Sequence, residues 1–498
     1  MRKATEPNAS TLETALFFFD FNSKSGLGHA IRTMRIAKRL KSQGWLTHFA
    51  LTQREKKGSS VLDELGISAK EIVWISPPPP SSQRDDFVVS WVRSELLNPA
   101  LRLNASLIFI DSYSVSEVWL REFRLCGLRS AVIDDLGGNL SPDFLIDYGV
   151  NAVVERSLHR SGVTKLLLGP MFTPVDACHE GATQPLGPKR VLISLGGGRY
   201  EELYRGLTLA HCATESSATL TFATPTGFEL PQRADMGRIR VIQGSQGLQS
   251  LMCDFDLVVT SAGVSLMERL SAGKNGIAVI TAQNQAPNVE KLREQLDLNV
   301  VSLDSLRNPV GFCREIEESL SQSWGASQRL PMQAIFDGHG ADRVTYEISG
   351  RPLEELRLQE ATERDLPILF RWANDSLAMS ASRRKSKITA KEHLDWFNSA
   401  PERKESIFVA FKANVPVGTV RLHATDRGVR LSYLVDPFYQ GAGVGKALVY
   451  QAIIASPRNQ EIFAEVAEEN LPSIRLLKSL GFEIATSETE FLRFVLRR

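Results

Sequence analysis

Cysteine, net charge and long apolar runs are all scarce in this chain of 498 residues. The five cysteines form no CxxC pair and none lies in the last third, so neither a disulfide framework nor a zinc site is expected. A formal charge of +1 argues against a nucleic-acid partner. No apolar run approaches the roughly 20 residues that span a membrane, and the first residues lack the layout of a signal peptide. We therefore expect a cytoplasmic enzyme of several domains, with no membrane partner.

Short apolar runs alternate with amphipathic stretches along the whole chain. Up to residue 350 this alternation predicts two doubly wound, parallel, Rossmann-like domains, at 13–180 and 188–350. After residue 351 the spacing becomes hairpin-like and predicts an α+β domain at 354–498. Strands are expected at 16–21, 47–51, 107–110, 131–133, 191–195, 219–223, 241–243, 257–260, 276–280, 356–361, 407–411, 416–423, 429–435 and 462–466. The fold class is α/β.

A glycine turn with a histidine follows the first expected strand. Gly26 and Gly28 lead into a helix whose first turn holds His29, with Arg32 one turn later. Glycines let the backbone approach a ligand, and the free N–H groups of a helix start attract phosphate. The positive end of the helix dipole disfavours imidazolium, so we expect a neutral His29 that acts as a base near pH 7.

Further small or polar residues follow other expected strands of the first 350 residues. Such strand ends in α/β sheets hold phosphates and sugars, and a carboxylate nearby suits ribose or sugar hydroxyls. Purely structural roles for these residues stay open, because a glycine pair is often only a tight turn and a carboxylate can simply pair with a neighbouring arginine. The candidates for binding a nucleotide sugar are Asp111, Tyr113, Gly197, Gly198, Ser261, Gly263, Glu268, Asn284 and Gln285.

The order of these motifs resembles the nucleotide-sugar hydrolase of pseudaminic acid biosynthesis, a relative in fold of GT-B glycosyltransferases. The resemblance implies a GT-B-like arrangement and hydrolysis of UDP-2,4-diacetamido-2,4,6-trideoxy-β-L-altropyranose to the free sugar and UDP. Attack at the anomeric carbon opposite UDP would invert the configuration, and because no metal-ligand cluster is evident in the sequence we expect a metal-independent reaction. The resemblance also implies that His29 is the base for the attacking water, and that Glu268, Asn284 and Gln285 hold the nucleotide and substrate. The motifs that carry it are GLGHAIRTMRIAKRL (26–40), DSY (111–113), IDD (133–135), LLGPMF (167–172), SLGGG (194–198), SAGVSLMERLSAGK (261–274), AQNQ (282–285) and DGHGADR (337–343).

A second glycine-rich turn lies between an expected strand and a helix near residue 440. Its backbone amides suit the pyrophosphate of coenzyme A. An N-x-x-S start to a later helix and a following Leu-Gly-Phe add specificity to the pattern. The candidates for acetyl-CoA binding in this pattern are Gln440, Gly441, Gly443, Gly445, Lys446, Asn470 and Ser473.

This C-terminal pattern resembles motifs A and B of the GNAT N-acetyltransferases, across residues 354–498. The resemblance implies attack of a sugar 4-amine on acetyl-CoA, with the carbonyl polarised by a backbone N–H near Leu434 and Val435, which it adds to the acetyl-CoA-binding candidates. Many members carry a tyrosine seven residues after the motif B asparagine, but Leu477 stands there in this chain. Tyr433, Tyr439 or solvent would then protonate the departing thiolate.

Together the two resemblances predict a bifunctional enzyme, in which the UDP-amino sugar is acetylated and then hydrolysed. Two rival hypotheses remain. One is a GT-B glycosyltransferase fused to an acyltransferase, and the other is a nucleotide-sugar sensor without catalytic activity.

Overall fold

The computed structural model describes residues 12–20, 28–52, 65–80, 82–155, 165–177, 187–198, 200–224, 231, 237–243, 248–350, 356–380, 384, 386–457, 460–488 and 491–497. The chain forms two compact units. The first is Met1–Ser323 with Gly340–Gly350, and the second is Trp324–His339 with Arg351–Arg498. Each is described by itself.

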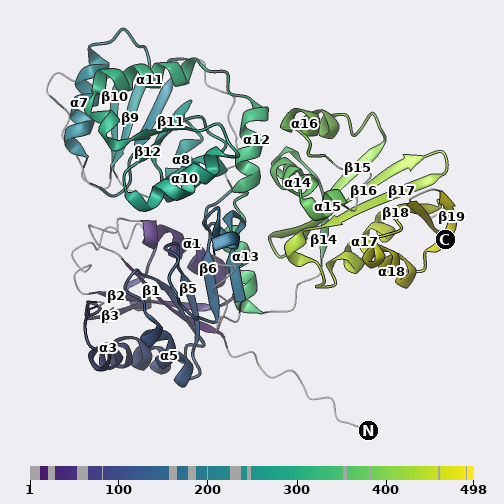
Figure 1. The fold of residues 1–498 in the computed structure, drawn as a ribbon, viewed down its shortest axis with the longest axis horizontal. Helices are drawn as coiled ribbons and strands as arrows, with labels where there is room; N and C mark the ends of the chain where they lie inside the picture. Colours follow the sequence, from purple (N-terminus) through teal and green to yellow (C-terminus); the bar gives the residue numbers. More distant parts are fainter. Residues whose placement is uncertain are drawn as a thin grey trace. The chain divides into compact units, whose positions relative to one another are not determined.

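The first sheet of the first unit is parallel and has the order β3-β2-β1-β4-β5-β6-β7 (Figure 1). Its strands are β1 (Thr14–Phe19), β2 (Leu46–Thr52), β3 (Ile72–Ile75), β4 (Leu107–Asp111), β5 (Arg129–Ile133), β6 (Phe144–Asp147) and β7 (Lys165–Leu168). Its helices are α1 (Gly28–Ser42), η2 (Ala69–Glu71), α3 (Asp85–Trp91), η3 (Val92–Leu97), α4 (Asn98–Arg102), α5 (Glu117–Leu125), α6 (Ala152–Glu155) and η4 (Pro170–Phe172).

The second sheet of this unit is also parallel, with the order β10-β9-β8-β11-β12-β13. Its strands are β8 (Arg190–Ser194), β9 (Thr219–Thr224), β10 (Ile239–Gln243), β11 (Leu257–Ser261), β12 (Ile277–Ile280) and β13 (Asn299–Ser302). The helices around it are α7 (Glu201–Cys212), α8 (Leu248–Met252), α9 (Val264–Ser271), η5 (Gln283–Gln285), α10 (Ala286–Arg293), η6 (Leu303–Arg307) and α11 (Pro309–Ser321). α13 (Gly340–Ser349) closes the unit by packing on α1.

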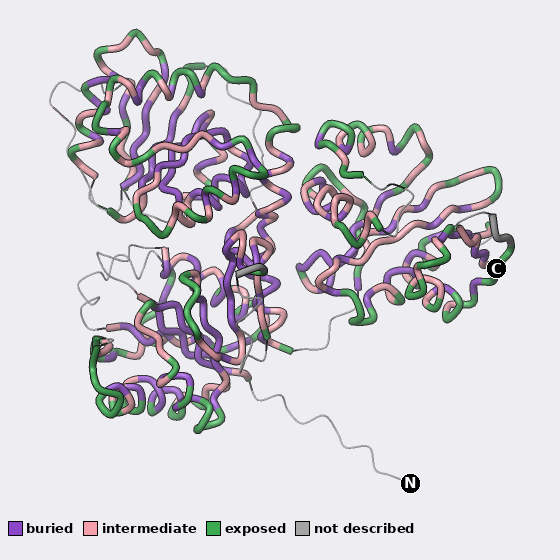
Figure 2. Tube along the Cα trace, viewed as in Figure 1, coloured by how far each residue is buried: buried purple, intermediate pink, exposed green. Residues whose placement is uncertain are grey.

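The central strands of both parallel sheets are buried on two faces and are purple in Figure 2, whereas the edge strands β3, β10 and β13 are partly exposed. Because side chains alternate along a strand, Leu16 and Phe18 pack in the cluster beneath α3 and α5. Phe17 faces the other way and stacks between Phe49 and Phe109. Strands covered on both faces read as continuous apolar runs, which is why the sequence predicts them so directly.

The sheet of the second unit is mostly antiparallel, with the order β14-β15-β16-β17-β18-β20-β19. Its strands are β14 (Arg357–Glu360), β15 (Glu405–Lys412), β16 (Val415–Thr425), β17 (Gly428–Val435), β18 (Ile462–Ala467), β19 (Glu483–Glu488) and β20 (Phe491–Leu496). Its helices are α12 (Ala326–Ile335), η7 (Glu363–Asp365), α14 (Leu366–Ala373), α15 (Ser376–Ser380), α16 (Ala390–Asn398), η8 (Pro437–Tyr439), α17 (Val444–Ala455) and α18 (Leu471–Ser479). The expected α/β class, with two parallel sheets and an α+β unit after them, is confirmed.

The division between the units differs from the expected boundary near residue 350, because α12 packs on α14 and α16 of the second unit. Leu330 of α12 shares a buried cluster with Leu366 and Ala390. The chain therefore runs from the first unit into the second at residue 324, returns for α13, and enters the second unit again after residue 350.

Leu330→Ala is expected to destabilise the second unit by about 2–5 kcal/mol, because it leaves a cavity between three helices. Urea denaturation followed by hydrogen exchange in peptides of each unit checks this: the midpoint for the second unit falls while that for the first unit stays. Leu209→Ala, on an exposed face of α7, is the control and should move neither. Equal shifts of both midpoints would contradict the assignment of α12 to the second unit.

Cys253 is disulfide-bonded, which corrects the expectation that no disulfide is indicated. The spacing of cysteines in a sequence indicates disulfides only when the cysteines recur at short, regular intervals, and the five cysteines of this chain do not. In the described part of the chain no helix is long and apolar enough to cross a membrane.

Candidate functional site

The crossovers of the first sheet reverse direction between β1 and β4. Open parallel sheets bind ligands at the carboxyl ends of the strands beside such a reversal. The chain after β1 enters α1, and the chain after β4 turns at Asp111–Tyr113. The predicted glycine–histidine motif and the DSY motif therefore lie together at this end of the sheet. Gly28 is the first residue of α1 and His29 the second; Gly26 lies outside the described residues.

His29 is held by Asp111. Its Nδ1 lies 2.7 Å from Oδ1 of that carboxylate, and the two residues are 5% and 0% exposed. A carboxylate only accepts hydrogen bonds, so Nδ1 carries the proton and Nε2 is the acceptor of the neutral ring. The ring of Tyr113 meets the imidazole edge-on, with centroids 4.7 Å apart.

Arg32 binds two carboxylates from one turn further along α1. Its Nε donates to Oδ2 of Asp111 at 2.6 Å, and Nη1 donates to Oδ2 of Asp135 at 2.8 Å. Nη1 also donates to the hydroxyl of Tyr148, which itself donates to Asp135 at 3.2 Å. Arg32 and Asp111 were expected to bind the nucleotide sugar, but the structure engages both in this buried network.

The charges of the network set the pKa of its members. Burial lowers the pKa of His29, but the adjacent Asp111 carboxylate outweighs it, and the net pKa is raised above 6.5. Burial alone would raise the pKa of Asp111, yet Arg32 and His29 hold it well below its usual range. The expectation that the helix dipole keeps His29 neutral was wrong in sign, because a carboxylate in contact outweighs a dipole worth about 0.3–1 kcal/mol.

The second sheet reverses direction between β8 and β11, and the predicted glycine turns lie there. A Cβ on Gly196 would lie 3.5 Å from Oγ of Ser261, so these two loops touch. A Cβ on Gly263, which precedes α9, would lie 3.4 Å from Nε2 of Gln285. The structure thus gathers Gly197, Gly198, Ser261, Gly263 and Gln285 at one edge of the sheet, with Asn284 exposed beside them.

Glu268 has a partner that its sequence neighbourhood does not reveal. It is 4% exposed, and its Oε1 accepts from Nη2 of Arg35 at 2.6 Å. Arg35 also donates to Asp176 at 3.1 Å and to the Gln249 side chain at 3.1 Å. This pair joins α1 to α9, and a role of Glu268 in holding the nucleotide stays a prediction.

Asn288 connects the two halves of the unit close to the histidine network. Its Oδ1 accepts from the backbone N–H of Val150 at 3.1 Å. Val150 lies two residues after Tyr148, and Asn288 follows Gln285 by less than one turn of helix. Tyr148, Arg35 and Asn288 were not among the predicted site residues, and Asp135 was named only within the IDD motif. The available signal was the position of Asp135 and Tyr148 just after β5 and β6.

In the second unit a glycine-rich turn links β17 to α17. Gly441 and Gly443 have φ of +81° and +78°, a left-handed conformation that favours glycine. Gly443 caps α17, so the N–H groups of the first three residues of this helix, Val444 to Lys446, have no intrahelical partner. Gln440 and Lys446 are exposed on either side of it.

The sheet opens beside this turn. Strands β17 and β18, both described throughout, pair only at Val429–Ile462 and Arg430–Phe463. From residue 431 to Leu434 and Val435 the edge of β17 that faces β18 has no strand partner, although the opposite edge pairs with β16 up to Val435. Backbone groups at an open edge bind extended chains that carry amides.

Two further features of this unit were not predicted. Asp436 is 2% exposed, and its Oδ2 accepts from Arg371 and from the indole N–H of Trp372, each at 2.7 Å. On the face covered by α16, the guanidinium groups of Arg403 and Arg421 lie 5.9 Å and 5.5 Å from the ring centre of Trp396.

These two arginines share a single carboxylate, Glu405, at 2.9 Å and 3.6 Å. Burial lowers the pKa of Arg421; Glu405 opposes this, while Arg430 and Arg403 lower it further. Glu405 therefore balances only part of the positive charge of Arg403, Arg421 and Arg430. We call Arg403, Arg421 and Arg430 the arginine cluster.

Residues 367–482 match the family model described as the Acetyltransferase (GNAT) family. The C-terminal unit contains a GNAT domain. The match includes the open edge of β17, the glycine-rich turn and the start of α18, where Oδ1 of Asn470 accepts from the N–H of Ser473 at 3.2 Å.

Three relatives each share about one fifth of their aligned residues with this chain. An uncharacterized protein of Methanocaldococcus jannaschii is 20% identical over 496 residues, which cover 93% of this chain and 95% of the relative. Spermidine N-acetyltransferase from Vibrio cholerae, solved with CoA and spermine, is 20% identical with a TM-score of 0.26; the match covers 28% of this chain and 95% of that one. An aminoglycoside acetyltransferase solved with coenzyme A is 20% identical with a TM-score of 0.26, covering 29% and 95%.

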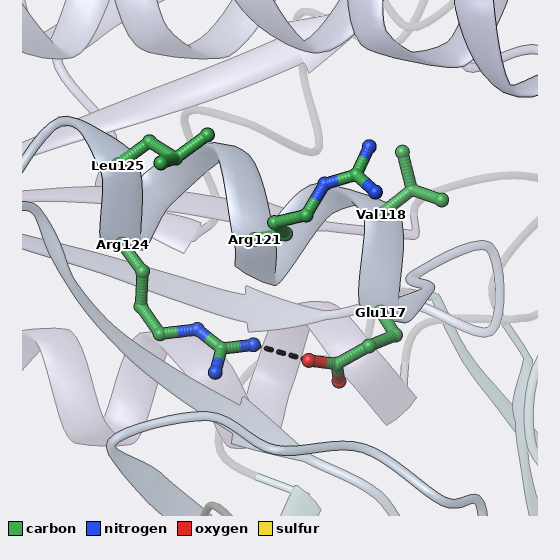
Figure 3. A pocket seen from close by; sticks show the side chains of 5 residues that line it. All are labelled: Glu117, Val118, Arg121, Arg124 and Leu125. Carbon is green, nitrogen blue, oxygen red and sulfur yellow. Dashed lines mark hydrogen bonds and ion pairs between the residues drawn. The ribbon is translucent and has the colours of Figure 1, made fainter.

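A shallow hollow on the first unit lies apart from these residues (Figure 3). One helix, α5, supplies its whole lining, including Arg121 and the ion pair between Arg124 and Glu117. None of its residues belongs to the His29 network. Among the described residues no group of three or more His, Cys, Asp or Glu side chains is placed to hold a metal ion.

Proposed function

We propose that the chain is a bifunctional enzyme that acetylates the 4-amine of a UDP-amino sugar with acetyl-CoA and then hydrolyses the product to UDP and the free sugar. The observation that carries the first step is the glycine-rich turn beside the open edge of β17, inside the GNAT match. The proposal for the second step rests on the His29–Asp111 pair and on the sequence resemblance.

In the acetyl transfer, the amides of residues 441–446 hold the pyrophosphate of acetyl-CoA, and its amide-bearing arm lies along the open edge of β17. The amine attacks the thioester carbonyl, which the N–H of Leu434 or Val435 polarises. Catalysis comes mainly from holding the two substrates together, and the oriented N–H stabilises the oxyanion that develops.

The arginine cluster supports an acceptor amine that also carries negative charge. Ser432 pairs with Arg421 across the strands, and Arg430 precedes it on β17. At about 3.3 Å per residue, Ser432 and Arg430 lie roughly 7 Å and 13 Å along the strand from Leu434. The diphosphate of a UDP-amino sugar lies across one pyranose ring from the 4-amine, which suits this spacing, whereas a polyamine would be repelled.

In the hydrolysis, Nε2 of neutral His29 accepts a proton from water as the water attacks the anomeric carbon opposite UDP. The carbon–oxygen bond to UDP breaks and its electron pair leaves with the diphosphate. Asp111 stabilises the imidazolium that forms. UDP is a good leaving group, so a second carboxylic acid is not required, in contrast to ordinary glycoside hydrolysis.

The two Rossmann-like halves of the first unit divide this work in a GT-B-like arrangement. The turns at Gly197 and Gly198 and the start of α9 after Gly263 hold the nucleotide, since helix starts at strand ends bind phosphate. The hydrogen bond from Val150 to Asn288 brings this half to the histidine network. Gln285 and Asn284 then lie where the sugar would be.

The test follows UDP and acetylated UDP-sugar by mass spectrometry, starting from UDP-4-amino-4,6-dideoxy-β-L-AltNAc with and without acetyl-CoA. We expect UDP release that requires acetyl-CoA. Acetylation without UDP release would overturn the hydrolase and favour a glycosyltransferase. Tight binding of the UDP-sugar with no turnover would favour a sensor.

A further inference from the structure

The segment between α12 and α13 is divided between the two units. Trp324–His339 belong to the second unit and Gly340–Gly350 to the first, so the boundary falls inside the motif DGHGADR. The last residue of the motif packs in the first unit, where Nη1 of Arg343 donates to the carbonyl oxygen of Met171 at 2.9 Å. The first residue, Asp337, has ion-pair and hydrogen-bond partners in the second unit, and the proposed hydrolysis gives it no role.

Asp337 is held by an arginine of α14. The side chain of Asp337 is 3% exposed; its Oδ1 accepts from the N–H of His339 at 3.0 Å and its Oδ2 accepts from Nη1 of Arg371 at 2.7 Å. Nη2 of the same arginine donates to Oδ2 of Asp436 at 2.7 Å, and the Asp436 side chain is also 3% exposed. One planar guanidinium therefore links two buried carboxylates.

Asp436 shapes the entry to the glycine-rich turn. It follows β17 directly, and its Oδ1 accepts from the N–H of Phe438 at 3.0 Å while its carbonyl oxygen accepts from the N–H of Tyr439 at 2.9 Å. These bonds cap η8, and the glycine-rich turn begins after it at Gln440. The position of this carboxylate therefore fixes the backbone between the open edge of β17 and the amides of residues 441–446.

Asp337 keeps the guanidinium of Arg371 where Asp436 needs it. A carboxylate buried as deeply as that of Asp436 is stable only when hydrogen bonds and opposite charge compensate it. The indole of Trp372 gives it a neutral donor, and Arg371 gives it a charged one. The arginine side chain is 23% exposed, so without a second carboxylate its guanidinium gains rotamer freedom and is free to turn toward water.

We propose that Asp337 is a positioning residue of the acetyl-CoA site, acting through Arg371 on Asp436 and so on the turn that holds the diphosphate of CoA. The acetyltransferase then depends on a residue that precedes the matched residues 367–482 and that belongs to a motif resembling the hydrolase. This inference rests on acetyl-CoA as the ligand of the GNAT domain and is independent of the acceptor amine.

The experiment measures the affinity of the full-length chain for free CoA by isothermal titration calorimetry. Asp337→Asn keeps the size of the side chain but only one acceptor oxygen, so it serves His339 or Arg371 and not both. We expect it to raise the Kd for CoA by about tenfold. Arg371→Gln should have a larger effect, and the double variant should bind CoA no more weakly than Arg371→Gln alone, because Asp337 acts through the arginine.

Two variants control for stability and for the loss of an acid. Leu330→Ala weakens the packing of α12 but leaves the ion pair between Asp337 and Arg371, and Asp395→Asn removes an exposed carboxylate of α16. Both should bind CoA as wild type does.

An Asp337→Asn variant that binds CoA within about twofold of wild type overturns the inference and leaves the GNAT assignment standing. Additive losses in the double variant also overturn it, since Asp337 would then act by another route. Asp337→Asn should release UDP from the acetylated UDP-sugar as wild type does; slower release with unchanged CoA affinity would place Asp337 in the hydrolase instead. Wild type that binds no CoA overturns the inference together with the proposed acetyl transfer.

Discussion

His29→Ala is expected to lower UDP release by about 10²–10⁴-fold, the range for loss of a general base. The side chain is the one group of the buried network whose neutral form combines a held proton on Nδ1 with a free acceptor on Nε2. Acetylation takes place in the other unit, so the acetylated UDP-sugar should accumulate. Mass spectrometry of UDP and the two UDP-sugars over time measures both effects.

His48→Ala is the matched control for this variant. His48 is a half-buried histidine of β2, on the strand next to β1, and it takes no part in the His29 network. It should release UDP at the wild-type rate. If His29→Ala also kept that rate, His29 would be a packing residue and the proposed hydrolysis would lose its base.

Asp111→Asn is expected to shift the acid limb of the pH–rate profile and to lower the rate by about 10²-fold or more. The base works only when His29 is neutral, so activity falls as pH drops through its pKa. Asp111 raises that pKa above 6.5, which places the wild-type limb above pH 6.5. Without the carboxylate, burial and Arg32 lower the pKa of His29 and only Asp135 raises it, so the limb should move to lower pH.

Thr33→Val separates the charge of Asp111 from its hydrogen bonds. The Thr33 hydroxyl donates to Oδ2 of Asp111 at 3.0 Å, and valine removes that bond but keeps the carboxylate. Its acid limb should stay with that of wild type. An Asp111→Asn profile with an unmoved limb would show that the base titrating in the assay is not His29.

The central strands of the two parallel sheets were predictable because they are buried on both faces, whereas β3, β6, β7 and β13 of these sheets and β19 and β20 of the second unit were not predicted. The expected strands at 47–51, 107–110 and 257–260 lie within β2, β4 and β11. The strand expected at 16–21 is β1 at Thr14–Phe19, because Thr14 and Ala15 are buried but carry little hydrophobic signal. The membership of α12 in the second unit was not predictable. The apolar face of the helix indicates that the helix is packed, but it does not indicate which elements it packs against.

The candidate site was predictable as a set of strand ends but not as a set of contacts. His29 and Asp111 lie 82 residues apart, and only the order of strands makes them neighbours. The pairing of Arg35 with Glu268 and of Asn288 with Val150 depends on how the two halves meet, which no local pattern records. The pKa of His29 was misjudged for the same reason.

The path of the chain between the units bears on how the two activities can be separated. Since α12 packs on the GNAT domain while α13, later in the sequence, packs on α1, a single cut leaves one unit without a helix. To express the two units as separate proteins, the GNAT protein would have to begin before residue 324 and would carry α13 as an insertion without its packing partner α1. The alternative is to change the order of the segments in the gene. A split design is therefore expected to work only when α13 is supplied to the first unit on its own tether.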